Sequence, residues 1–593
     1  MLKHKKITAD FCVVGGGMTG ICAAVAAARG GASVVLMHER PVLGGNASSE
    51  IRMWICGAQG SNNRETGILE EIALENYYRN PTKNYYIWDT VLYDFVKREK
   101  NITLLLNCTC MDAETVRGSF DFGRNTRIEK ITGYQMTTQT FFDVYAQNYS
   151  DCSGDSILAP LTGAEYRIGR ESAEEFGEDT HVKTADKNTM GMSCLLTGRE
   201  TTKPVKFTPP EWHTQLAAGD FTHRTPYIRS SSENFWYLEL GGDRDSIGDT
   251  EEIAAELVPL AIGTWDYIKN SGDCNADNWE LDFLGFLPGK RESRRMVGEY
   301  MITERDIAGN RHFDDTVAFG GWPLDDHFPG GFYHKGTPNT NIQTPPAYHI
   351  PYRILYSKNV SNLFFAGRNV SMTHMAMSSI RVMATCGIMG QAVGTAAAMC
   401  AEYHISPHEI YVNKIDELRS RLAACDCFIP GYKRKIGALC LATPIINGSD
   451  ALKTGADRPH LSYSLDKIGV SVPNGTVLVY RFASPEYIRT LHVTFDSDLN
   501  RTTLPGDECE RTHTMRANVR LDSPVFYVPK TLCKSFCIEI TTPTGTRTLY
   551  KTEKNLNRAY EIAVNDEVLG LSLAPAENWG GSDCTTVFSF DFA

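Results

Sequence analysis

The sequence predicts an α/β protein: a Rossmann-like nucleotide-binding domain with an inserted α+β domain, followed by an all-β jelly-roll or sandwich domain. Three observations predict this fold. A strand, glycine turn, helix and second strand fill residues 10–40, and strands ending in glycine turns recur near residues 151 and 367. Beyond residue 430, short strands alternate with turns. At 593 residues the chain is too long for a single hydrophobic core.

The first glycine turn follows a short apolar run. Gly15, Gly17 and Gly20 fill the spacing G-x-G-x-x-G. Glycines at this spacing turn the chain, let backbone N–H groups approach a pyrophosphate, and allow the helix to pack on the strand. The pyrophosphate is expected at the positive N-terminus of the helix, beside Met18 and Thr19.

The second strand of this pattern ends at an acid. Glu39, followed by Arg40, stands where a carboxylate accepts hydrogen bonds from ribose hydroxyls. The alternative is a plain βαβ core unit. Because strand, glycines, helix and acid are all in place, the stretch predicts dinucleotide binding.

Three later pieces are expected to meet the same ligand. A second glycine pair follows the acid, and glycine permits another close approach of the backbone, although a surface loop is the alternative. Two further strands run into small-residue turns, and the second turn leads to a helix of small residues. The residues expected to contact the cofactor in these pieces are Gly44, Gly45, Asn46, Ala47, Ser48, Asp151, Gly154, Gly367, Arg368, Gly387 and Gln391.

These patterns predict three domains. Residues 1–165 and 346–425 form a discontinuous nucleotide-binding domain, and 166–345 form an inserted substrate domain with one clear helix over 249–270. Residues 430–593 form the β-rich domain. Its strands are predicted over 476–482, 488–495, 512–521, 535–541 and 586–592.

Bulk properties exclude several classes of partner. The net charge of −12 argues against nucleic acid, since nothing offsets phosphate repulsion. The 17 cysteines show no C-x-x-C spacing, which argues against a metal site and favours free thiols in a reducing compartment. We find no signal segment and no apolar run long enough for a membrane span. A cytoplasmic protein is therefore expected.

Together these pieces resemble the FAD-dependent oxidoreductase family with a glutathione-reductase-type fold. More narrowly, they resemble its bacterial branch often found beside carbohydrate-degrading systems. The motifs that carry the resemblance lie at 15–20, 39–40, 44–48, 151–155, 291–295, 320–323 and 365–394. They run in the family's order.

The resemblance implies non-covalently bound FAD. Its pyrophosphate is expected on the turn 15–20 and its adenosine ribose on Glu39, with contacts from 367–368 to the pyrophosphate and ribityl chain. The flavin is expected between 44–48 and the start of the helix that carries Gly387. A helix N-terminus near the flavin N1–C2=O edge would stabilise the reduced anion.

Flavin chemistry also needs a group that takes or gives a proton. His374 is the first catalytic candidate because it follows the turn at 367–368, and His349 is the second. Each is otherwise a core histidine that satisfies backbone groups. Arg381 is placed to hold an anionic or polyhydroxyl substrate, or the phosphate side of the cofactor.

Acidic residues near an aromatic ring point to the substrate. Asp325, Asp326 and His327 follow Trp322 and suit sugar hydroxyls and ring stacking, although solvated loop acids are the commoner case. The segment 288–299 is dense in charge, with a solvated face and a structural or substrate-facing role as equal alternatives.

The expected function is oxidation of a carbohydrate or polyol hydroxyl by hydride transfer to flavin N5. The alternatives are a redox-assisted glycoside-cleaving enzyme (oxidation, elimination, re-reduction) and a non-catalytic protein that binds flavin or carbohydrate. The expected partners are a small-molecule substrate such as a sugar or glycoside, an unidentified electron acceptor and a second copy of the chain. The β-rich domain resembles galactose-binding-type jelly rolls, which bind sugars or mediate packing and oligomerisation.

Overall fold

The computed structural model describes residues 2–179, 182–228, 234–463, 465, 467–504, 513–515 and 520–593. Its contacts divide the chain into two compact units. The first comprises Met1–Ala58, Thr82–Ile415 and His513–Pro524. The second comprises Gln59–Pro81, Asp416–Thr512 and Val525–Ala593. The domain limits expected from the sequence stay a prediction, and each unit is described by itself.

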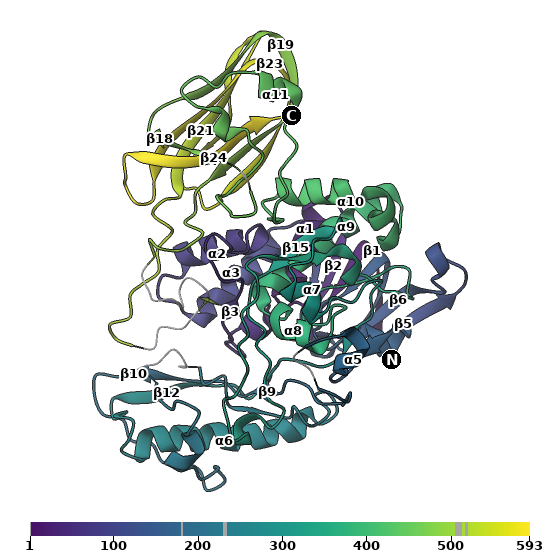
Figure 1. The fold of residues 1–593 in the computed structure, drawn as a ribbon, viewed down its shortest axis with the longest axis vertical. Helices are drawn as coiled ribbons and strands as arrows, with labels where there is room; N and C mark the ends of the chain where they lie inside the picture. The colour runs from purple at the N-terminus through teal and green to yellow at the C-terminus, as the bar shows by residue number, and fades with distance from the viewer. Residues whose placement is uncertain are drawn as a thin grey trace. The chain divides into compact units, whose positions relative to one another are not determined.

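The first unit is built on a seven-stranded sheet in the order β4-β2-β1-β7-β6-β5, with β17 beside β7 (Figure 1). Strands β4, β2, β1, β7 and β17 are parallel, whereas β5, β6 and β7 form an antiparallel meander. Their bounds are β1 (Lys3–Val14), β2 (Val34–Met37), β4 (Ile102–Leu105), β5 (Cys108–Arg117), β6 (Thr126–Gln135), β7 (Thr140–Asp151) and β17 (Leu363–Phe365). The parallel part confirms the predicted Rossmann-like α/β domain.

Strand β1 lies at the centre of this sheet. Residues 11–14 are fully buried between β2 and β7, which explains their unbroken apolar run. The strand begins at Lys3, well before that run, because its exposed first half pairs with the first half of β7. Alternating polar residues concealed this extension in the sequence.

Helices α1 (Met18–Arg29) and α9 (Met383–Tyr403) pack together through glycine. A Cβ at Gly390 would lie 2.2 Å from the carbonyl oxygen of Thr19, and one at Gly394 would lie 2.1 Å from that of Ala23. The two helices therefore touch through their backbones. Among the described helices, α9 alone has the length and composition to cross a membrane, and 89% of its most apolar window is buried inside the structure.

The remaining elements of the first unit connect and cover this frame. The helices are α3 (Tyr85–Lys97), α4 (Leu158–Thr162), α5 (Ala173–Phe176), α7 (Glu304–Ala308) and α8 (His374–Ile380), and α10 (Pro407–Ala424) follows α9. The short strands are β3 (Ile55–Cys56), β8 (Tyr166–Arg167), β14 (Arg295–Met296), β15 (Thr316–Gly320), β16 (Tyr348–Pro351) and β20 (His513–Thr514).

The inserted segment has a buried cluster of its own. Helix α6 (Thr250–Asn270) lies along the ladder of β10 (Leu196–Glu200) and β12 (Trp279–Leu284), as Figure 1 shows. The predicted helix 249–270 is thus confirmed. Its apolar face contributes Leu257 and Trp265 to the cluster. The other strands of the segment are β9 (Met192–Ser193), β11 (Glu239–Leu240) and β13 (Gly289–Lys290).

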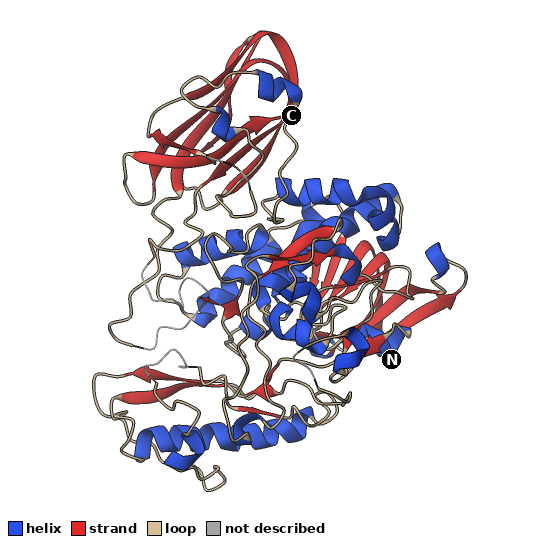
Figure 2. Ribbon diagram, viewed as in Figure 1, coloured by secondary structure: helices blue, strands red, loops and turns tan. Residues whose placement is uncertain are grey.

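The second unit is dominated by strands (Figure 2). They form one six-stranded sheet in the order β18-β24-β19-β23-β21-β22, with antiparallel pairing. The bounds are β18 (Val470–Pro473), β19 (Leu478–Phe495), β21 (Cys533–Thr542), β22 (Gly545–Thr552), β23 (Ala559–Asn578) and β24 (Cys584–Phe592), with helices α2 (Ile68–Arg79) and α11 (Ala438–Ala442). The all-β character is confirmed.

Two strand predictions in this unit need correction. The strands predicted at 476–482 and 488–495 are one strand, β19, whose pairing shifts register between Arg481 and Glu486. Strands β18, β22 and β23 were not predicted, and in β23 polar residues interrupt the apolar alternation. Half of the predicted strand 512–521 lies outside the described residues, and His513–Thr514 of the other half form β20.

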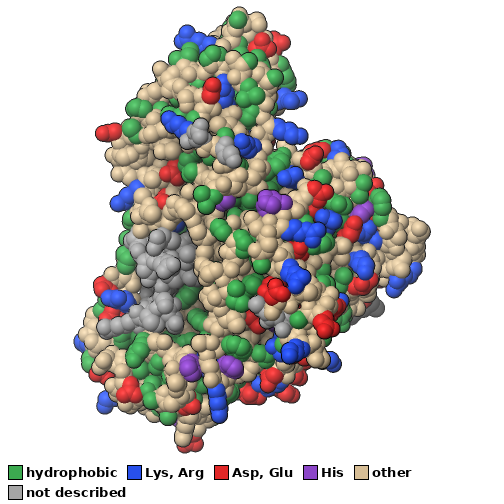
Figure 3. All heavy atoms as spheres, viewed as in Figure 1, with side chains coloured by type: hydrophobic (Ala, Val, Ile, Leu, Met, Phe, Trp, Pro, Cys, Tyr) green, Lys and Arg blue, Asp and Glu red, His purple; other side chains and the backbone are tan. Residues whose placement is uncertain are grey.

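The distribution of surface charge and the state of the cysteines are those of an ordinary globular protein. On the face shown in Figure 3, the described acidic and basic side chains are interspersed. The 16 cysteines that the structure describes are all free thiols.

We expect Gly394→Ala to destabilise the protein by about 1–3 kcal/mol, because its methyl group would overlap the α1 backbone. Thermal unfolding measures the effect. Gly219→Ala is the matched control, since no heavy atom lies within 4 Å of its added Cβ. Equal melting temperatures for the two variants would contradict the packing described here.

Candidate functional site

The first glycine turn follows β1 and contacts the ends of β2 and β7. Gly15 donates its N–H to Met37 at 2.8 Å and has a φ of +107°, which favours glycine. A Cβ there would lie 2.3 Å from the Cys152 carbonyl oxygen, and a Cβ at Gly20 would lie 1.8 Å from that of Gly15. These two positions therefore exclude any side chain for reasons internal to the fold.

Gly17 differs, because its position is open. A Cβ at Gly17 would meet only the Cα of Gly45, at 3.8 Å. Gly17 is also the N-cap of α1, which has no side-chain cap and no acid in its first turn. Met18 and Thr19 in that turn are buried. A buried, uncapped helix N-terminus needs an acceptor for its N–H groups, and a pyrophosphate fits that need.

The second glycine pair lies directly beside the first turn. Gly44 donates its N–H to Gly16 at 2.9 Å and has a left-handed φ of 111°. The short 3₁₀ turn Gly45–Ala47 follows, and the Asn46 amide donates to the Lys290 carbonyl at 3.1 Å. Ala47 and Ser48 are buried at the end of this turn. Residues 44–48 thus join the glycine turn to the inserted segment.

The acid of the nucleotide pattern stands at the end of β2. The side chain of Glu39 is 46% exposed, and Arg40 lies 3.5 Å from it and 3.4 Å from Glu50. The buried His38, which the sequence did not single out, accepts the Gly16 N–H at Nδ1 (3.0 Å). The carboxylate of Glu39 lies 3.2 Å from Nδ1 of His38, and its partial exposure still leaves it accessible to a ribose.

The turns that follow β7 and β17 lie beside each other, and the second also lies beside Thr19 of α1. Asp151 is fully buried and accepts the Leu158 N–H at 2.8 Å, so it holds the turn that carries Gly154. Asp155 accepts hydrogen bonds from Arg368 (2.7 Å) and Lys290 (2.9 Å). A Cβ at Gly367 would lie 3.5 Å from the Thr19 hydroxyl.

Two neighbouring cations keep the side chain of Asp155 ionised. Burial alone would raise its pKa, but Arg368 and Lys290 lower the pKa of Asp155 to about 2. The Arg368 side chain retains a buried Nε without a hydrogen-bond partner among the described residues. An anionic ligand at this turn would satisfy that nitrogen.

A second uncapped helix N-terminus lies further along. Helix α9 starts after Val382 with no side-chain cap and no acid, and its first turns, with Gly387 and Gln391, are buried. Because Gly390 contacts Thr19 and Gly394 contacts Ala23, α9 and α1 run in the same direction. Helix α9 extends six residues beyond the start of α1, or about 9 Å at 1.5 Å per residue. Two separated donor sites of this kind fit the two ends of an elongated cofactor such as FAD.

His374 is held between two carboxylates. Its Nδ1 lies 2.8 Å from Glu292 and its Nε2 lies 3.0 Å from Asp326, and the residue is 1% exposed. Burial alone would lower its pKa, but Glu292 and Asp326 raise the pKa of His374 to about 10. His374 is therefore protonated at neutral pH. It can give a proton there but cannot take one.

Further charges continue from this histidine. Arg295 pairs with Glu171 at 2.9 Å, and Arg291 lies 3.3 Å from Glu239. His327 lies 2.6 Å from Glu239. We call the following mostly buried residues the ion-pair cluster: Glu171, Glu239, Arg291, Glu292, Arg295, Asp325, Asp326, His327, His374 and Arg381.

Arg381 belongs to the cluster through Asp325, to which it donates at 3.1 Å. Burial alone would raise the pKa of Asp325, but His327 and Arg381 hold it well below its usual range. The Trp322 indole also donates to Asp325, at 3.4 Å. The three consecutive residues 325–327 are therefore ion-pair partners in the structure, and the solvated-loop alternative is wrong.

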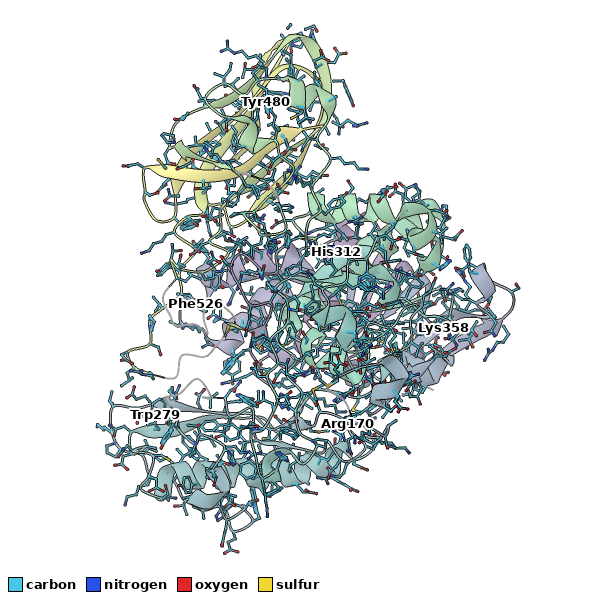
Figure 4. All side chains as sticks on the ribbon, viewed as in Figure 1. Arg170, Trp279, His312, Lys358, Tyr480 and Phe526 are labelled. Carbon is cyan, nitrogen blue, oxygen red and sulfur yellow. The ribbon has the colours of Figure 1, made fainter. Side chains whose placement is uncertain are left out.

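His349 lies elsewhere. Its ring centroid lies 4.1 Å from that of His312, with the two planes tilted by 46°, and its Nδ1 contacts Thr316 at 3.3 Å. Its neighbour Tyr348 instead contacts Ser379 in α8. Adjacent strand residues point to opposite faces. Figure 4 shows His312 well apart from Arg170, whose charge acts on Asp326. The structure does not bring His349 into the cluster.

The segment 288–299 contacts both the cofactor side and the ion-pair cluster. The sequence alone did not decide between a solvated face and a structural or substrate-facing role for it. Lys290 contacts Asp155, Arg291 contacts Glu239, and Glu292 contacts His374. Glu239 and Glu292 were not identified from the sequence, because their partners are distant along the chain. The available signal was charge density within a run of small residues.

The fold and the glycine turns define a Rossmann-like dinucleotide-binding protein. A family model described as FAD dependent oxidoreductase matches residues 10–422. The chain belongs to this family of FAD-dependent oxidoreductases, and FAD is its cofactor. Among the described residues no group of three or more His, Cys, Asp or Glu side chains is placed to hold a metal ion.

Solved structures that match this chain include three reductases or reductase-like proteins. E. coli quinol fumarate reductase is 11% identical and covers 71% of this chain and 75% of its own, with a TM-score of 0.27. Archaeoglobus fulgidus adenylylsulfate reductase is 12% identical (72% and 75% covered, TM-score 0.28). A geranylgeranyl bacteriochlorophyll reductase-like protein from Thermoplasma acidophilum is 12% identical (72% and 93%, TM-score 0.29). These likenesses carry no argument about function. Comparison with curated proteins finds no match.

We expect Gly17→Ala to weaken FAD binding while sparing the apoprotein. Its methyl group enters open space beside the uncapped helix, where the pyrophosphate is expected. Fluorescence titration should show the Kd for FAD raised at least tenfold, about 1.4 kcal/mol. Gly20→Ala is the contrasting variant and should destabilise the apoprotein itself. Unchanged FAD affinity in Gly17→Ala would refute this placement.

We also expect a pH-dependent stability from His374. Because its folded pKa of about 10 exceeds the ordinary value of about 6.5, its ion pairs contribute fully below about pH 6.5 and are lost as pH rises through about 10. Denaturant unfolding should show the stability difference between wild type and His374→Gln shrinking over that range. A constant difference would show that His374 does not carry this charge.

Proposed function

We propose that this FAD-dependent oxidoreductase oxidises a hydroxyl of a carbohydrate or polyol. The observation that carries the proposal is the carboxylate of Asp326. Its Oδ1 contacts His374, whereas its Oδ2 takes no hydrogen bond from the described residues, and the side chain is 16% exposed. Asp326 therefore offers one oxygen to a ligand while the other is fixed.

The pairing of charges supports a neutral, hydroxyl-bearing substrate. Each cation of the ion-pair cluster has a carboxylate partner, so an added charge would lack compensation, whereas hydroxyl groups can hydrogen-bond to the carboxylates. The indole of Trp322 beside Asp325 offers an aromatic surface of the kind that packs on sugar rings.

The residues have distinct tasks in this reaction. Bound FAD supplies the acceptor for a hydride from the substrate carbon. Burial alone would raise the pKa of Asp326, but His374 lowers it, so Asp326 is ionised at neutral pH. Its Oδ2 accepts the hydrogen bond of the substrate hydroxyl and then its proton. His374 keeps the carboxylate oriented through Oδ1, and Arg381 holds Asp325 beside it.

The protonated state of His374 favours one alternative. A redox-assisted glycoside-cleaving enzyme oxidises a sugar hydroxyl, eliminates the glycosidic oxygen and then re-reduces the product. Elimination needs a proton donor for the leaving oxygen, and the imidazolium of His374 would supply its proton through Asp326, because both of its ring nitrogens contact carboxylates. A scaffold that only binds flavin or carbohydrate gains no such support from the ion-pair cluster.

The other expectations extend this proposal. The C-terminal unit is proposed to be a jelly roll or sandwich that binds sugar or mediates assembly of a homo-oligomer. The free cysteines favour a reducing compartment, so the enzyme is proposed to be cytoplasmic. The electron acceptor is a separate small molecule or protein.

The test is anaerobic titration of the holoenzyme with polyols, sugars, glycosides and uronic acids, followed by the visible flavin bands. We expect neutral sugars or polyols to bleach the bands, and Asp326→Asn to slow bleaching about 10²–10⁴-fold. The surface variant Asp94→Asn, whose carboxylate pairs with Arg98, serves as the control.

Each outcome discriminates among the candidates. Release of aglycone from a glycoside without net bleaching identifies the glycoside-cleaving alternative. Bleaching only by uronic acids contradicts the neutral-substrate argument. No bleaching and no aglycone release with any member of the panel rejects the proposed function.

A further inference from the structure

We propose that Glu292 is a positioning residue: its carboxylate fixes the ring of His374 as a cation with Nε2 directed at Asp326, so that Asp326 remains the open carboxylate of the site. The role of Asp326 toward substrate rests on the proposed function. The coupling of Glu292 to the His374 ring stands on geometry alone.

Glu292 is held rigidly. It is 0% exposed and lies between β13 and β14, where each oxygen lies beside a cation, although Oε1 takes no hydrogen bond from the described residues. Oε2 accepts the Met190 N–H at 2.9 Å and contacts Nδ1 of His374 at 2.8 Å, while Oε1 lies 3.2 Å from Nε of Arg295. A carboxylate fixed in this way determines where the imidazole ring can point.

Arg295 secures Glu292 from the other side. Its residue exposure is 0%, and its guanidinium also contacts Glu171 at 2.9 Å and the Met372 carbonyl at 2.7 Å. The Met372 carbonyl lies two residues before His374. The same arginine therefore anchors both the carboxylate and the chain that carries the histidine.

Among the described residues, charged groups from several segments face His374, and ion pairs with two of them reach its ring. Glu292 and Asp326 contact the nitrogens, whereas Glu171 accepts the His374 backbone N–H at 3.0 Å. Arg170 pairs with Asp186 nearby, and the charge of His374 acts on Asp186. Burial alone would lower the pKa of His374, so the ring stays charged only through its carboxylates.

The arrangement has a consequence for the neighbouring acid. A neutral His374 would leave Asp326 without its cation, and burial would then raise the pKa of Asp326. Glu292 thus acts on Asp326 through the ring, with no contact of its own to the substrate oxygen.

The test is a pH titration of His374 in substrate-free holoenzyme carrying ¹³C-labelled histidine, with the resonance assigned through His374→Gln. We expect Glu292→Gln to raise the acid dissociation constant of His374 at least tenfold, which is one pKa unit. The matched control, Glu171→Gln, removes another carboxylate partner of Arg295 that does not contact the ring, and should have a smaller effect. An unchanged His374 titration in Glu292→Gln overturns the proposal.

Two further kinetic measurements complete the test. In the presence of a substrate that bleaches the flavin, the alkaline limb of kcat/KM should move to lower pH in Glu292→Gln, which a merely structural role would not produce. If that variant does not fold, Glu292→Asp keeps the charge but shortens its reach, and should lower kcat at least tenfold while His374 stays protonated at neutral pH. A wild-type kcat in Glu292→Asp overturns the proposal. The titration needs no substrate, so a failure of the proposed function is recognised separately.

Discussion

The direct backbone contact between α1 and α9 is the constraint on which the cofactor site depends. Gly390 and Gly394 admit the carbonyl oxygens of Thr19 and Ala23, so two helices more than 350 residues apart run side by side in the same direction. The contact places two buried, uncapped N-termini at one end of the pair. Because each terminus needs a hydrogen-bond acceptor, this packing both closes the domain and prepares it for an anionic, elongated cofactor.

The proposed catalytic part of the site, the ion-pair cluster, is built from paired charges. Consecutive residues of the segment 290–292 contact Asp155 on the cofactor side, Glu239 beside His327, and His374. A buried charge without a partner is costly, so these pairs are held in place by mutual compensation. The proposed function uses the same compensation, because a neutral substrate with hydroxyl groups would leave these pairs undisturbed.

Local features of the fold could be predicted from the sequence, and long-range pairs could not. The glycines at 15, 17 and 20 can be recognised because the strand and the helix that flank them are adjacent to them in the chain. Glu292 is different, because its partner His374 lies 82 residues away and charge density alone favours a solvated face equally. His349, the second catalytic candidate, lies beside Thr316 and His312, because the sequence does not reveal which face of a strand a side chain occupies. Helix α2 packs in the second unit although its neighbours in sequence belong to the first.

The most direct test of the account is hydrogen exchange of the apoprotein and the FAD-loaded protein, resolved by peptide. We expect FAD to slow amide hydrogen exchange in two sequence-distant segments, 17–21 and 383–387, because both carry uncapped helix N–H groups. Protection of the first segment without the second would contradict the claim that α9 supplies the other end of the cofactor site.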